Sequence, residues 1–539
     1  MVLAERKFAV VLCYFKDLSD FPLFLFSSWL AACCVPLAAS VWFLCYLLCV
    51  LPLALSPVLT TIPTPTAPTV TRDCVNKFSQ GGACCSGAIE ISTSVVSIDD
   101  NAFAQCIGLT SVFIPSGVTD IGDYAFYEDS ALTTINIPTG VGAVGISAFY
   151  ACRSLLSITL PVSLSYVNDF AFYGCTALSR VVLPTTLLNI GYSGFNSCTA
   201  LTEVTLPSSL TAIASYSFYN CRNLTSANIP TSVSFIGSSA FSYGSSLASA
   251  SIPKSVSALG DQVFYSCSSL WSVTIASSVT LLGPQVFYQC TSLSSIIIPT
   301  SITAMGYEVF AQCSSLASLA IPSSVATIDS FAFANCGKLS SISLPSSLTL
   351  IPNYAFQSCS SLLIANIPTS VTAVGAGAFY YSTSLLSVSL PTSLSSIGDS
   401  SFSGCNSLSF VSLPTGITTI AASTFSGCSS LSGVSVPSGV LSISMSAFMH
   451  CSSLMSIALP AALSYIGSSA FYGCGSLPSI EIPSGVSAID YGAFGTVSDA
   501  PCNMGTATKL YVSASMAVSV YSDVKISCNV LVLTRGSFA

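Results

Sequence analysis

Cysteine is the residue type in this chain with the greatest capacity for chemistry, because a thiolate can bind a metal, form a disulfide or attack a substrate. The 539 residues include 24 cysteines. Most of them form one column with a spacing of 23 residues or a multiple of it: Cys106, Cys152, Cys175, Cys198, Cys221, Cys267, Cys290, Cys313, Cys336, Cys359, Cys405, Cys428, Cys451 and Cys474. Where the column is interrupted, the slot holds Asp129, Gly244, Ser382 or Val497.

These varied replacements indicate that no disulfide or metal depends on any single cysteine of the column. We therefore predict a ladder of buried thiols, in which cysteine serves as a small hydrophobic residue. Two alternatives stay open. Neighbouring units could bring two such cysteines within disulfide distance, and a metal site is the second.

Other catalytic groups are sparse. His450 is the only histidine, so a Ser-His-Asp triad has no other candidate, and a histidine-rich zinc site is excluded. It stands beside Cys451 in a variable slot, where we expect a surface residue. Glu128 and Asp129 are adjacent in sequence, whereas a glycosidase pair faces across a cleft. We predict no catalytic, cofactor-binding or metal-binding residues, and no enzyme activity.

Two rows of side chains with the same spacing are candidate binding surfaces. The first is a hydroxyl ladder of Ser249, Ser272, Ser295, Ser318 and Ser341. The second is a tyrosine row of Tyr127, Tyr150, Tyr173, Tyr219, Tyr265 and Tyr288. Tyrosine is enriched where proteins meet partners, because it combines apolar area with one polar tip. The alternative is that these tyrosines only shield the edge of the fold.

A repeat must position these rows. Phenylalanine recurs at every 23rd residue from Phe103 to Phe494, which gives eighteen units without an insertion. In nearly every unit a leucine follows six residues later, and a proline precedes by eleven. A fixed period of this length predicts a solenoid, in which each unit buries its apolar face against its neighbours.

The pattern inside one unit predicts its elements. The segment Leu132–Ile137 ends in an alternation of apolar and variable residues, which is typical of a strand with one buried face. Pro138 then ends the strand, because proline cannot donate to a ladder. A second apolar pair, Val141 and Val144, follows before the chain turns toward Phe149. We expect parallel strands, each followed by a short return strand or a 3-10 turn.

The unit reads L-x-x-I-x-I-P-x-x-V-x-x-I-G-x-x-A-F-x-x-C-x-x-L, and it resembles the BspA-like (Treponema-type) leucine-rich repeat across residues 87 to 500. The resemblance implies a leucine-rich-repeat solenoid. It also implies a surface-exposed or secreted protein that acts in adhesion and protein binding. It supplies no catalytic residues.

The composition of the chain indicates which classes of partner it can bind. Charged residues make up 6% of the chain, and 13 Lys plus Arg against 21 Asp plus Glu give a net charge of −8. A nucleic-acid partner is therefore not expected, since no basic stripe is present. Serine and threonine fill most outward slots.

The N-terminal region predicts contact with a membrane. No charged residue occurs from Phe21 to Leu59, and the apolar run within it is long enough to span a bilayer. We expect a cytosolic segment (1–20), a membrane-inserting segment (21–59) and a Thr/Pro-rich stalk (60–73). An uncleaved signal anchor, a cleaved signal peptide and a misassigned start of the gene are the alternatives. Asn223 begins the sequon Asn223–Thr225, a candidate N-glycosylation site.

Both ends of the solenoid (103–500) need caps, which we assign to residues 74–102, including the start of the first repeat, and 501–539. A Cys502–Cys528 disulfide, and one from Cys74 to Cys84 or Cys85, would stabilise these caps in an oxidising compartment. The tail from Lys509 to Leu533 alternates enough to add final strands.

We therefore expect a cell-surface single-pass or secreted protein whose extended face binds a protein or glycan ligand. The alternative is a structural matrix protein, or one with a glycan-binding or ice-binding surface. Interruptions of the hydroxyl row at Arg180, Glu203, Ile364, Phe410 and Gly433 disfavour the alternative.

Overall fold

The computed structural model describes residues 86–490, 492–495, 509–513 and 531–535, all within one compact unit of the chain. The predicted membrane-inserting segment, stalk and cap cysteines lie outside these residues. In the described part the chain winds into a parallel β-solenoid of about 18 turns, about 23 residues apart, with no helix. We call each turn a coil.

Most coils contribute one strand to a front row, because their Leu-x-x-Ile-x-Ile segments alternate buried and exposed side chains; the coils of Val204 and Ile296 have no named front strand. The front row consists of β1 (Ser86–Glu90), β3 (Gly108–Phe113), β5 (Thr134–Asn136), β7 (Ser157–Thr159), β9 (Arg180–Val182), β12 (Ser226–Asn228), β14 (Ser249–Ser251), β16 (Ser272–Thr274), β19 (Ser318–Ala320), β21 (Ser341–Ser343), β23 (Ile364–Asn366), β25 (Ser387–Ser389), β27 (Phe410–Ser412), β29 (Gly433–Ser435), β31 (Ser456–Ile457), β33 (Ser479–Glu481), β35 (Lys509–Ser513) and β36 (Leu531–Arg535).

A second row of two-residue strands returns behind the first, and so the short return strand, rather than a 3-10 turn, is the element found. The return row consists of β2 (Ser97–Ile98), β4 (Asp120–Ile121), β6 (Ala143–Val144), β8 (Tyr166–Val167), β10 (Asn189–Ile190), β11 (Ala212–Ile213), β13 (Phe235–Ile236), β15 (Ala258–Leu259), β17 (Leu281–Leu282), β18 (Ala304–Met305), β20 (Thr327–Ile328), β22 (Leu350–Ile351), β24 (Ala373–Val374), β26 (Ser396–Ile397), β28 (Thr419–Ile420), β30 (Ser442–Ile443), β32 (Tyr465–Ile466) and β34 (Ala488–Ile489).

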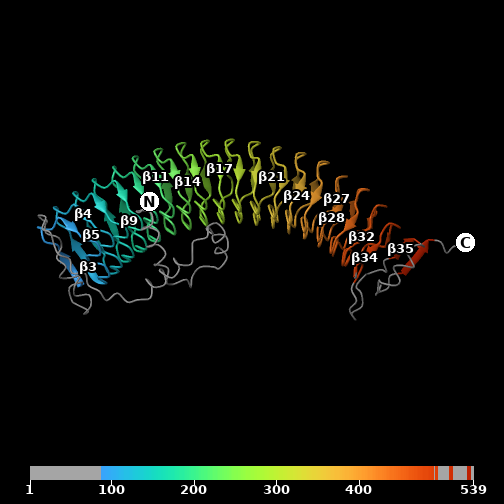
Figure 1. The fold of residues 1–539 in the computed structure, drawn as a ribbon, viewed down its shortest axis with the longest axis horizontal. Coiled ribbons are helices and arrows are strands. Elements are labelled where there is room, and N and C mark those ends of the chain that lie inside the picture. The colour runs from blue at the N-terminus through green and yellow to red at the C-terminus, as the bar shows by residue number, and fades with distance from the viewer. Residues whose placement is uncertain (1–85, 491, 496–508, 514–530, 536–539) are drawn as a thin grey trace, which may run out of the picture. The chain divides into compact units, whose positions relative to one another are not determined.

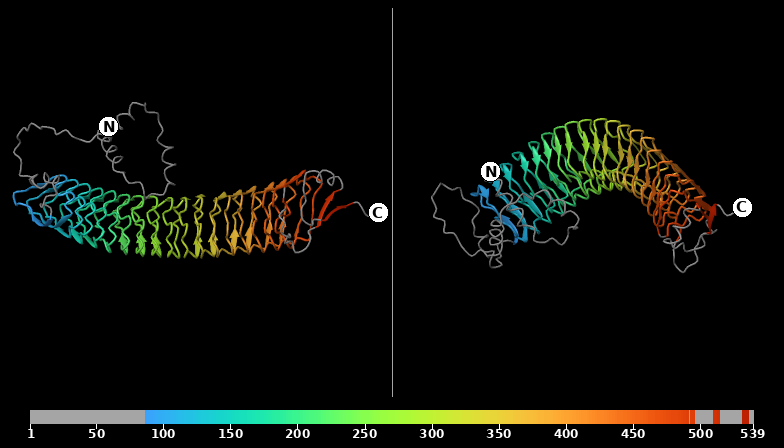
Figure 2. Two further views of the ribbon diagram at one scale, coloured as in Figure 1. Left: turned by 90° about the horizontal axis from the view of Figure 1, so that it is seen from below. Right: turned by 45° about the vertical axis from the view of Figure 1, so that its right-hand side comes forward.

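Pairing in both rows is parallel, and from β3 to β34 it keeps the 23-residue register, as in Ser249↔Ser272 of the front row and Ile213↔Ile236 of the return row. The coils therefore stack in chain order, with both rows running the length of the stack (Figure 1, Figure 2). The predicted final strands are confirmed, because β35 and β36 extend the front row beyond β33 in parallel register.

The repeat phenylalanines form the centre of the core. Successive rings stack nearly parallel, with centroids 5.2 Å apart for Phe103 and Phe126 and 5.9 Å apart for Phe310 and Phe333. From Phe126 to Phe471 the rings are almost completely buried, and leucine and aliphatic residues of both rows pack around them. Burying one such side chain contributes on the order of 1.5 to 3 kcal/mol before conformational entropy is subtracted.

In nearly every coil, proline ends the front strand by starting a turn. The carbonyl of Pro138 accepts the N–H of Val141 at 3.1 Å, and the carbonyl of Pro161 accepts that of Leu164 at 3.0 Å. The missing proline N–H therefore costs no ladder bond, while its carbonyl closes the turn into the return strand.

Candidate binding surface

A second turn, centred on the repeat phenylalanine, carries the surface of interest. In each coil it connects the return strand to the next front strand. The residues two before and two after the phenylalanine adopt left-handed backbone conformations, such as Tyr124 (φ 57°) and Glu128 (φ 59°) around Phe126. Their N–H groups, and that of the phenylalanine, donate to carbonyls of the next coil; the Phe126 N–H reaches the Ala148 carbonyl at 2.8 Å. A third hydrogen-bond ladder thus runs along the stack.

Aromatic side chains on this turn join into one continuous surface, which we call the aromatic strip. Neighbouring ring centroids are separated by 4.6 Å at the shortest and 6.1 Å at the longest. In order along the strip, the rings belong to Tyr124, Tyr127, Tyr150, Tyr173, Phe170, Tyr192, Tyr216, Tyr219, Tyr243, Tyr265 and Tyr288.

The geometry changes along the strip. On either side of its middle the rings stack in parallel, with Tyr150 and Tyr173 inclined by 7° and Tyr265 and Tyr288 by 11°, although the first pair of the strip, Tyr124 and Tyr127, is inclined by 61°. In the middle, every neighbouring pair from Tyr173 to Tyr265 is inclined by 53° to 68°. In a parallel stack the neighbouring rings cover both faces of a ring, whereas inclined packing leaves part of a ring face uncovered by its neighbours.

The middle is also the most accessible part. Tyr192 is 41% exposed and Tyr243 is 38% exposed, while the other rings of the strip are half-buried. Half-buried rings have little freedom to move, so a partner meets a surface that is already ordered.

Amide side chains form ladders beside the C-terminal end of the strip. Gln262 Nε2 donates to Gln285 Oε1 at 2.5 Å, and Gln285 Nε2 donates to Glu308 Oε2 at 2.6 Å. On the other side of the turn, Gln289 Nε2 donates to Gln312 Oε1 at 2.8 Å, and Gln312 Nε2 donates to the Tyr288 hydroxyl at 2.6 Å. These bonds connect successive coils and fix the orientation of polar groups next to the rings.

Carboxylates lie close enough to the strip to influence its hydroxyls. Burial and the charges of Tyr173 and Glu128 raise the pKa of Tyr150 to about 12, against a lowering effect of Arg153. Burial, Tyr216 and Asp169 likewise raise the pKa of Tyr192. Burial, and after it the charge of Glu308, raises the pKa of Tyr288. The strip is therefore a neutral aromatic surface in a negative environment.

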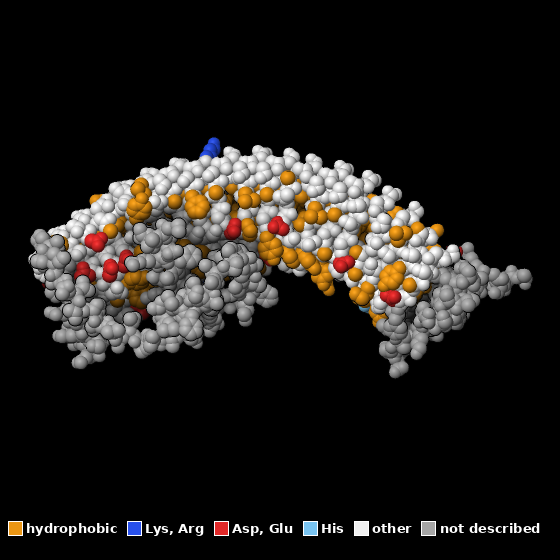
Figure 3. Space-filling view, viewed as in Figure 1, with side chains coloured by type: hydrophobic (Ala, Val, Ile, Leu, Met, Phe, Trp, Pro, Cys, Tyr) orange, Lys and Arg blue, Asp and Glu red, His pale blue; other side chains and the backbone are white. Residues whose placement is uncertain are grey.

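Aspartates on this turn also accept hydrogen bonds from backbone N–H groups. Asp169 Oδ1 accepts the N–H of Tyr192 at 2.8 Å, and Asp123 Oδ1 accepts that of Ile146 at 2.6 Å. Asn353 occupies the equivalent slot and accepts the N–H of Ala376 at 2.8 Å. Ser215 and Ser238 accept the equivalent N–H groups through their hydroxyls in the same slot, so a neutral oxygen makes this contact and a full negative charge is not required for folding. In the space-filling view, acidic side chains lie among hydrophobic ones along the visible face, and basic side chains appear only at its upper margin (Figure 3).

Comparison with known proteins agrees with this architecture. The family model of the BspA type leucine rich repeat region, which has six copies of the repeat, matches residues 78–199, 165–294, 282–405 and 372–499. The chain belongs to the BspA-type leucine-rich repeat family. No curated protein matches it.

Several solved structures resemble this BspA-type chain. A leucine-rich repeat protein from Bacteroides ovatus is 25% identical, with 83% of this chain and 91% of that chain covered and a TM-score of 0.42. A leucine rich cell surface protein from Faecalibacterium prausnitzii is 24% identical, with coverages of 69% and 86% and a TM-score of 0.32. A leucine-rich repeat protein from T. pallidum is 31% identical, with coverages of 30% and 78% and a TM-score of 0.28.

The cysteine column of the BspA-type coils is mainly a ladder of buried thiols, as predicted. From Cys152 to Cys474 its members are buried and free. Each donates its S–H to the phenylalanine carbonyl of the preceding coil, as Cys313 Sγ does to the Phe287 oxygen at 3.1 Å. Ser382 Oγ makes the same bond to the Phe356 carbonyl at 2.8 Å. In these coils the slot therefore holds a small side chain with one donor, and Gly244 leaves that bond out in its own coil.

Two members of the column depart from the ladder. Cys106 is disulfide-bonded, whereas the described cysteines from Cys152 to Cys474 are free. Asp129, the next residue in the column, is fully buried. Its Oδ1 accepts the N–H of Cys106 at 2.7 Å, while Oδ2 has no hydrogen-bond partner in the described part of the chain. Burial raises the pKa of Asp129 to about 8 against the lowering effect of the Cys106 N–H.

The hydroxyl row lies on the front strands, on a different part of the coil. Ser249 and Ser272 are direct neighbours across β14 and β16, and Ser318 and Ser341 across β19 and β21. Ser295 occupies the intermediate coil outside any named strand. Most of these serines are exposed.

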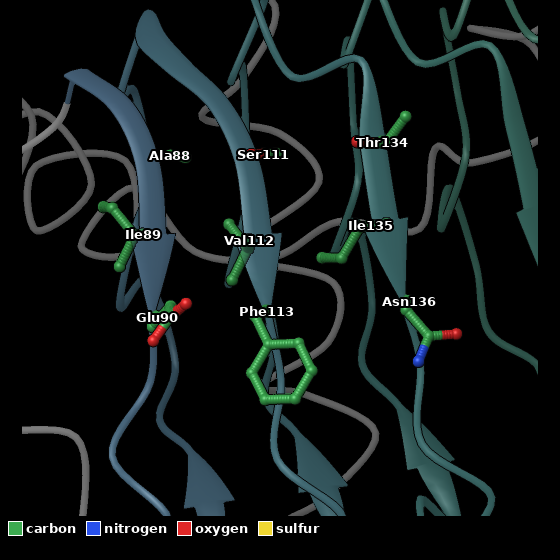
Figure 4. Close-up of a pocket in the computed structure, with 9 residues that line it drawn as sticks. All are labelled: Ala88, Ile89, Glu90, Ser111, Val112, Phe113, Thr134, Ile135 and Asn136. Atoms are coloured by element: carbon green, nitrogen blue, oxygen red, sulfur yellow. The ribbon is translucent and has the colours of Figure 1, made fainter.

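A shallow hollow opens on the first front strands, where this surface is less polar (Figure 4). The ring of Phe113, 54% exposed, lies between Glu90 of β1 and Asn136 of β5. The hollow is lined by Ala88, Ile89, Glu90, Ser111, Val112, Phe113, Thr134, Ile135 and Asn136. The front face is thus not a uniform hydroxyl surface.

The structure places the remaining candidates individually. His450 has a left-handed backbone (φ 59°), and its ring packs edge-on against Tyr472. Asn223 is exposed. Cys502 and Cys528 fall outside the described residues, as do Cys74, Cys84 and Cys85. Within the described ranges, no group of three His, Cys, Asp or Glu could hold a metal ion, and no helix has the length and apolar character to cross a membrane.

Sequence reasoning found part of the aromatic strip. The six tyrosines of the predicted row all belong to it, but the bridging rings of Phe170, Tyr192, Tyr216 and Tyr243 were missed. These lie two or three residues before, or two after, the repeat phenylalanine. Only the left-handed turn brings such positions against the predicted row, so reading a single column could not reveal them.

Proposed function

We propose that this BspA-type protein is a cell-surface or secreted scaffold that binds a partner protein through the aromatic strip of its solenoid. The supporting observation is the continuity of the strip, which links rings from the coil of Phe126 to the coil of Phe287. Tyrosine brings large contact area at low conformational cost, and it is enriched in interfaces. The proposed role is binding, without catalysis.

Several features support an extracytosolic location within this proposal. Disulfides persist in oxidising compartments, and Cys106 is disulfide-bonded. The apolar segment at 21–59 would anchor the chain as a single-pass protein or direct its secretion, with residues 60–73 as a stalk. The exposed sequon at Asn223 would carry a glycan. Disulfides at the proposed caps, including Cys502–Cys528, belong to the same proposal.

The location is tested on intact cells with a membrane-impermeant amine-reactive biotin. We expect labelling of the chain without permeabilisation, and a loss of mass at Asn223 when N-glycans are removed enzymatically. Labelling only after permeabilisation would contradict a surface location, and recovery of labelled protein from the medium would identify the secreted form.

The binding surface is tested by chemical crosslinking of cells that express wild type or a triple variant, Tyr127→Ala, Tyr150→Ala and Tyr173→Ala. We expect the crosslinked partner to be reduced at least tenfold in the variant. The control is Tyr166→Ala, which removes a tyrosine that is 49% exposed on β8, away from the strip. Equal loss in the control, or none in the triple variant, would reject the strip as the binding surface.

The hydroxyl row supports a second candidate, a structural or glycan-binding surface. Serine pairs in direct register, such as Ser249↔Ser272 and Ser318↔Ser341, present hydroxyls at the spacing of parallel strands. Polysaccharide pull-down and thermal-hysteresis assays separate this candidate from protein adhesion. Retention on a polysaccharide that is lost with Ser249→Ala and Ser272→Ala would favour it.

A further inference from the structure

The middle of the aromatic strip differs from its ends in what it offers a ligand. Between Tyr192 and Tyr243 the rings are inclined by 55° to 68° to their neighbours, and the two most exposed rings of the strip are found here. Ring faces carry the negative part of the aromatic quadrupole, so this region attracts cations.

Carboxylates lie beside the middle and the C-terminal end of the strip. Asp169 is exposed beside Tyr192 and adds to the rise of its pKa. The pKa of Tyr265 is raised by burial, by the neighbouring tyrosines and then by Glu308. The pKa of Tyr288 is raised by burial and then by Glu308. Negative charge is therefore found along the strip from its middle to its C-terminal end.

Basic groups near the strip are few. Between residues 86 and 495 the only lysines and arginines are Arg153, Arg180, Arg222, Lys254 and Lys338. Arg222 Nε donates to Asn220 Oδ1 at 2.7 Å, and Arg153 lies near enough to Tyr150 to lower its pKa against burial and the neighbouring charges. The acids of this region outnumber its bases, so a cationic partner is favoured by the whole surface.

We infer that the aromatic strip binds an extended, arginine- or lysine-bearing segment of its partner protein. The inference rests on the proposed protein-binding function and names the chemistry of the partner. Cationic side chains would lie over the inclined rings of Tyr192, Tyr219 and Tyr243, and Asp169 would pair with one of them.

The repeat spacing specifies the form of the segment. Neighbouring coils are separated by the parallel strand spacing, about 4.7 to 4.9 Å, so two coils span about 9.4 to 9.8 Å. A polyproline II chain rises about 3.1 Å per residue, or about 9.3 Å in three residues. A cation at every third residue of such a chain would therefore recur in step with every second coil.

The probe is fluorescein-labelled (Arg-Pro-Pro)5, and the assay is fluorescence anisotropy with the full-length chain. Matched probes are (Gln-Pro-Pro)5, (Glu-Pro-Pro)5 and a neutral oligosaccharide, cellohexaose. We expect binding of the arginine probe, at least tenfold weaker binding of the glutamine probe, and weaker binding of the arginine probe as salt rises. Equal binding of the glutamine probe, or binding of cellohexaose in preference to the arginine probe, would overturn the inference.

Two variants locate the site. Tyr192→Ala with Tyr243→Ala should weaken the arginine probe at least tenfold. Asp169→Asn should weaken it about threefold, and the variant should fold normally, because Asn353 provides the same backbone contact in its own coil. The controls are Tyr166→Ala and Glu203→Gln, the latter on the front face. Equal losses in the controls would show nonspecific charge attraction and overturn the inference.

The two proposals fail separately. Suppose that the variants of the aromatic strip lose the natural partner on cells but bind the arginine probe as well as wild type does. The cationic chemistry is then wrong, while the strip is still the binding surface. If strip variants retain the natural partner on cells, the proposed function itself is wrong.

Discussion

Asp129 shows how a single residue tests the cysteine column. It occupies a slot that in most other coils holds a buried donor, and it leaves one carboxylate oxygen without a partner in the described part of the chain. Burial raises the pKa of Asp129 from 3.8 to about 8, although the hydrogen bond from the Cys106 N–H lowers it. The folded chain therefore keeps a proton that the unfolded chain releases. The stability associated with this group is complete below about pH 3.8, and it is lost as the pH rises toward 8.

Asp129→Cys should therefore stabilise the chain at pH 7.5 by about 5 kcal/mol, since the thiol restores the donor of the column without a charge. At pH 4 the difference from wild type should nearly vanish. Urea unfolding at both pH values measures it. A gain that is equal at pH 4 and pH 7.5 would show that packing, and not the buried carboxyl, is responsible.

At the scale of one element, the turn around the repeat phenylalanine is held in left-handed conformations that glycine adopts without strain. Gly174 has φ +70°, and an added Cβ would meet only ordinary contacts, the nearest being the Cα of Ala151 at 3.6 Å. Gly174→Ala should therefore lower the free energy of unfolding by about 1 kcal/mol through backbone strain alone. Urea unfolding measures this loss.

Gly475→Ala is the matched control for this turn. No atom lies within 4 Å of its added Cβ, and its backbone is not left-handed. We expect a change well below that of Gly174→Ala. Comparable losses at the two positions would mean that the left-handed conformation imposes no particular cost in this turn.

The sequence predicted some elements better than others, for a physical reason. The front strands, prolines and buried phenylalanines each follow a periodic side-chain pattern, so their positions could be read directly. The left-handed turn holds residues as different as Ser147, Phe170 and Gln262 in equivalent positions. Its geometry is fixed by hydrogen bonds between backbones of neighbouring coils, which leave little trace in side-chain type. The bridging rings of the aromatic strip depend on that turn and were missed with it.

At the scale of the whole molecule, the buried thiols make stability sensitive to alkali. Burial raises the pKa of thiols such as Cys290, Cys313 and Cys336 above the ordinary value of 9.0. Below pH 9 this has no effect, because the thiols are protonated in both states. As the pH rises above 9 only the unfolded chain ionises, so the folded chain loses about 1.4 kcal/mol of stability per thiol and pH unit.

Replacing Cys290, Cys313 and Cys336 by serine should therefore reduce this alkaline loss by about 4 kcal/mol per pH unit, while Ser382 shows that serine can make the same hydrogen bond. Urea unfolding between pH 8 and 10 compares the slopes. Tyrosines contribute equally to both proteins, so identical slopes would contradict a role for the thiols.

The central claim is that the stack of coils exists to hold the aromatic strip in line for a partner. The most direct measurement places a photocrosslinking benzoylphenylalanine at Tyr219, at Tyr166 or at Ser295, one at a time, in the full chain on cells. Tyr219 tests the aromatic strip, while Tyr166 and Ser295 test the return row and the front row. We predict that illumination joins the partner at Tyr219 and not at the other two positions. A crosslink at Ser295 or Tyr166, with none at Tyr219, would contradict the account.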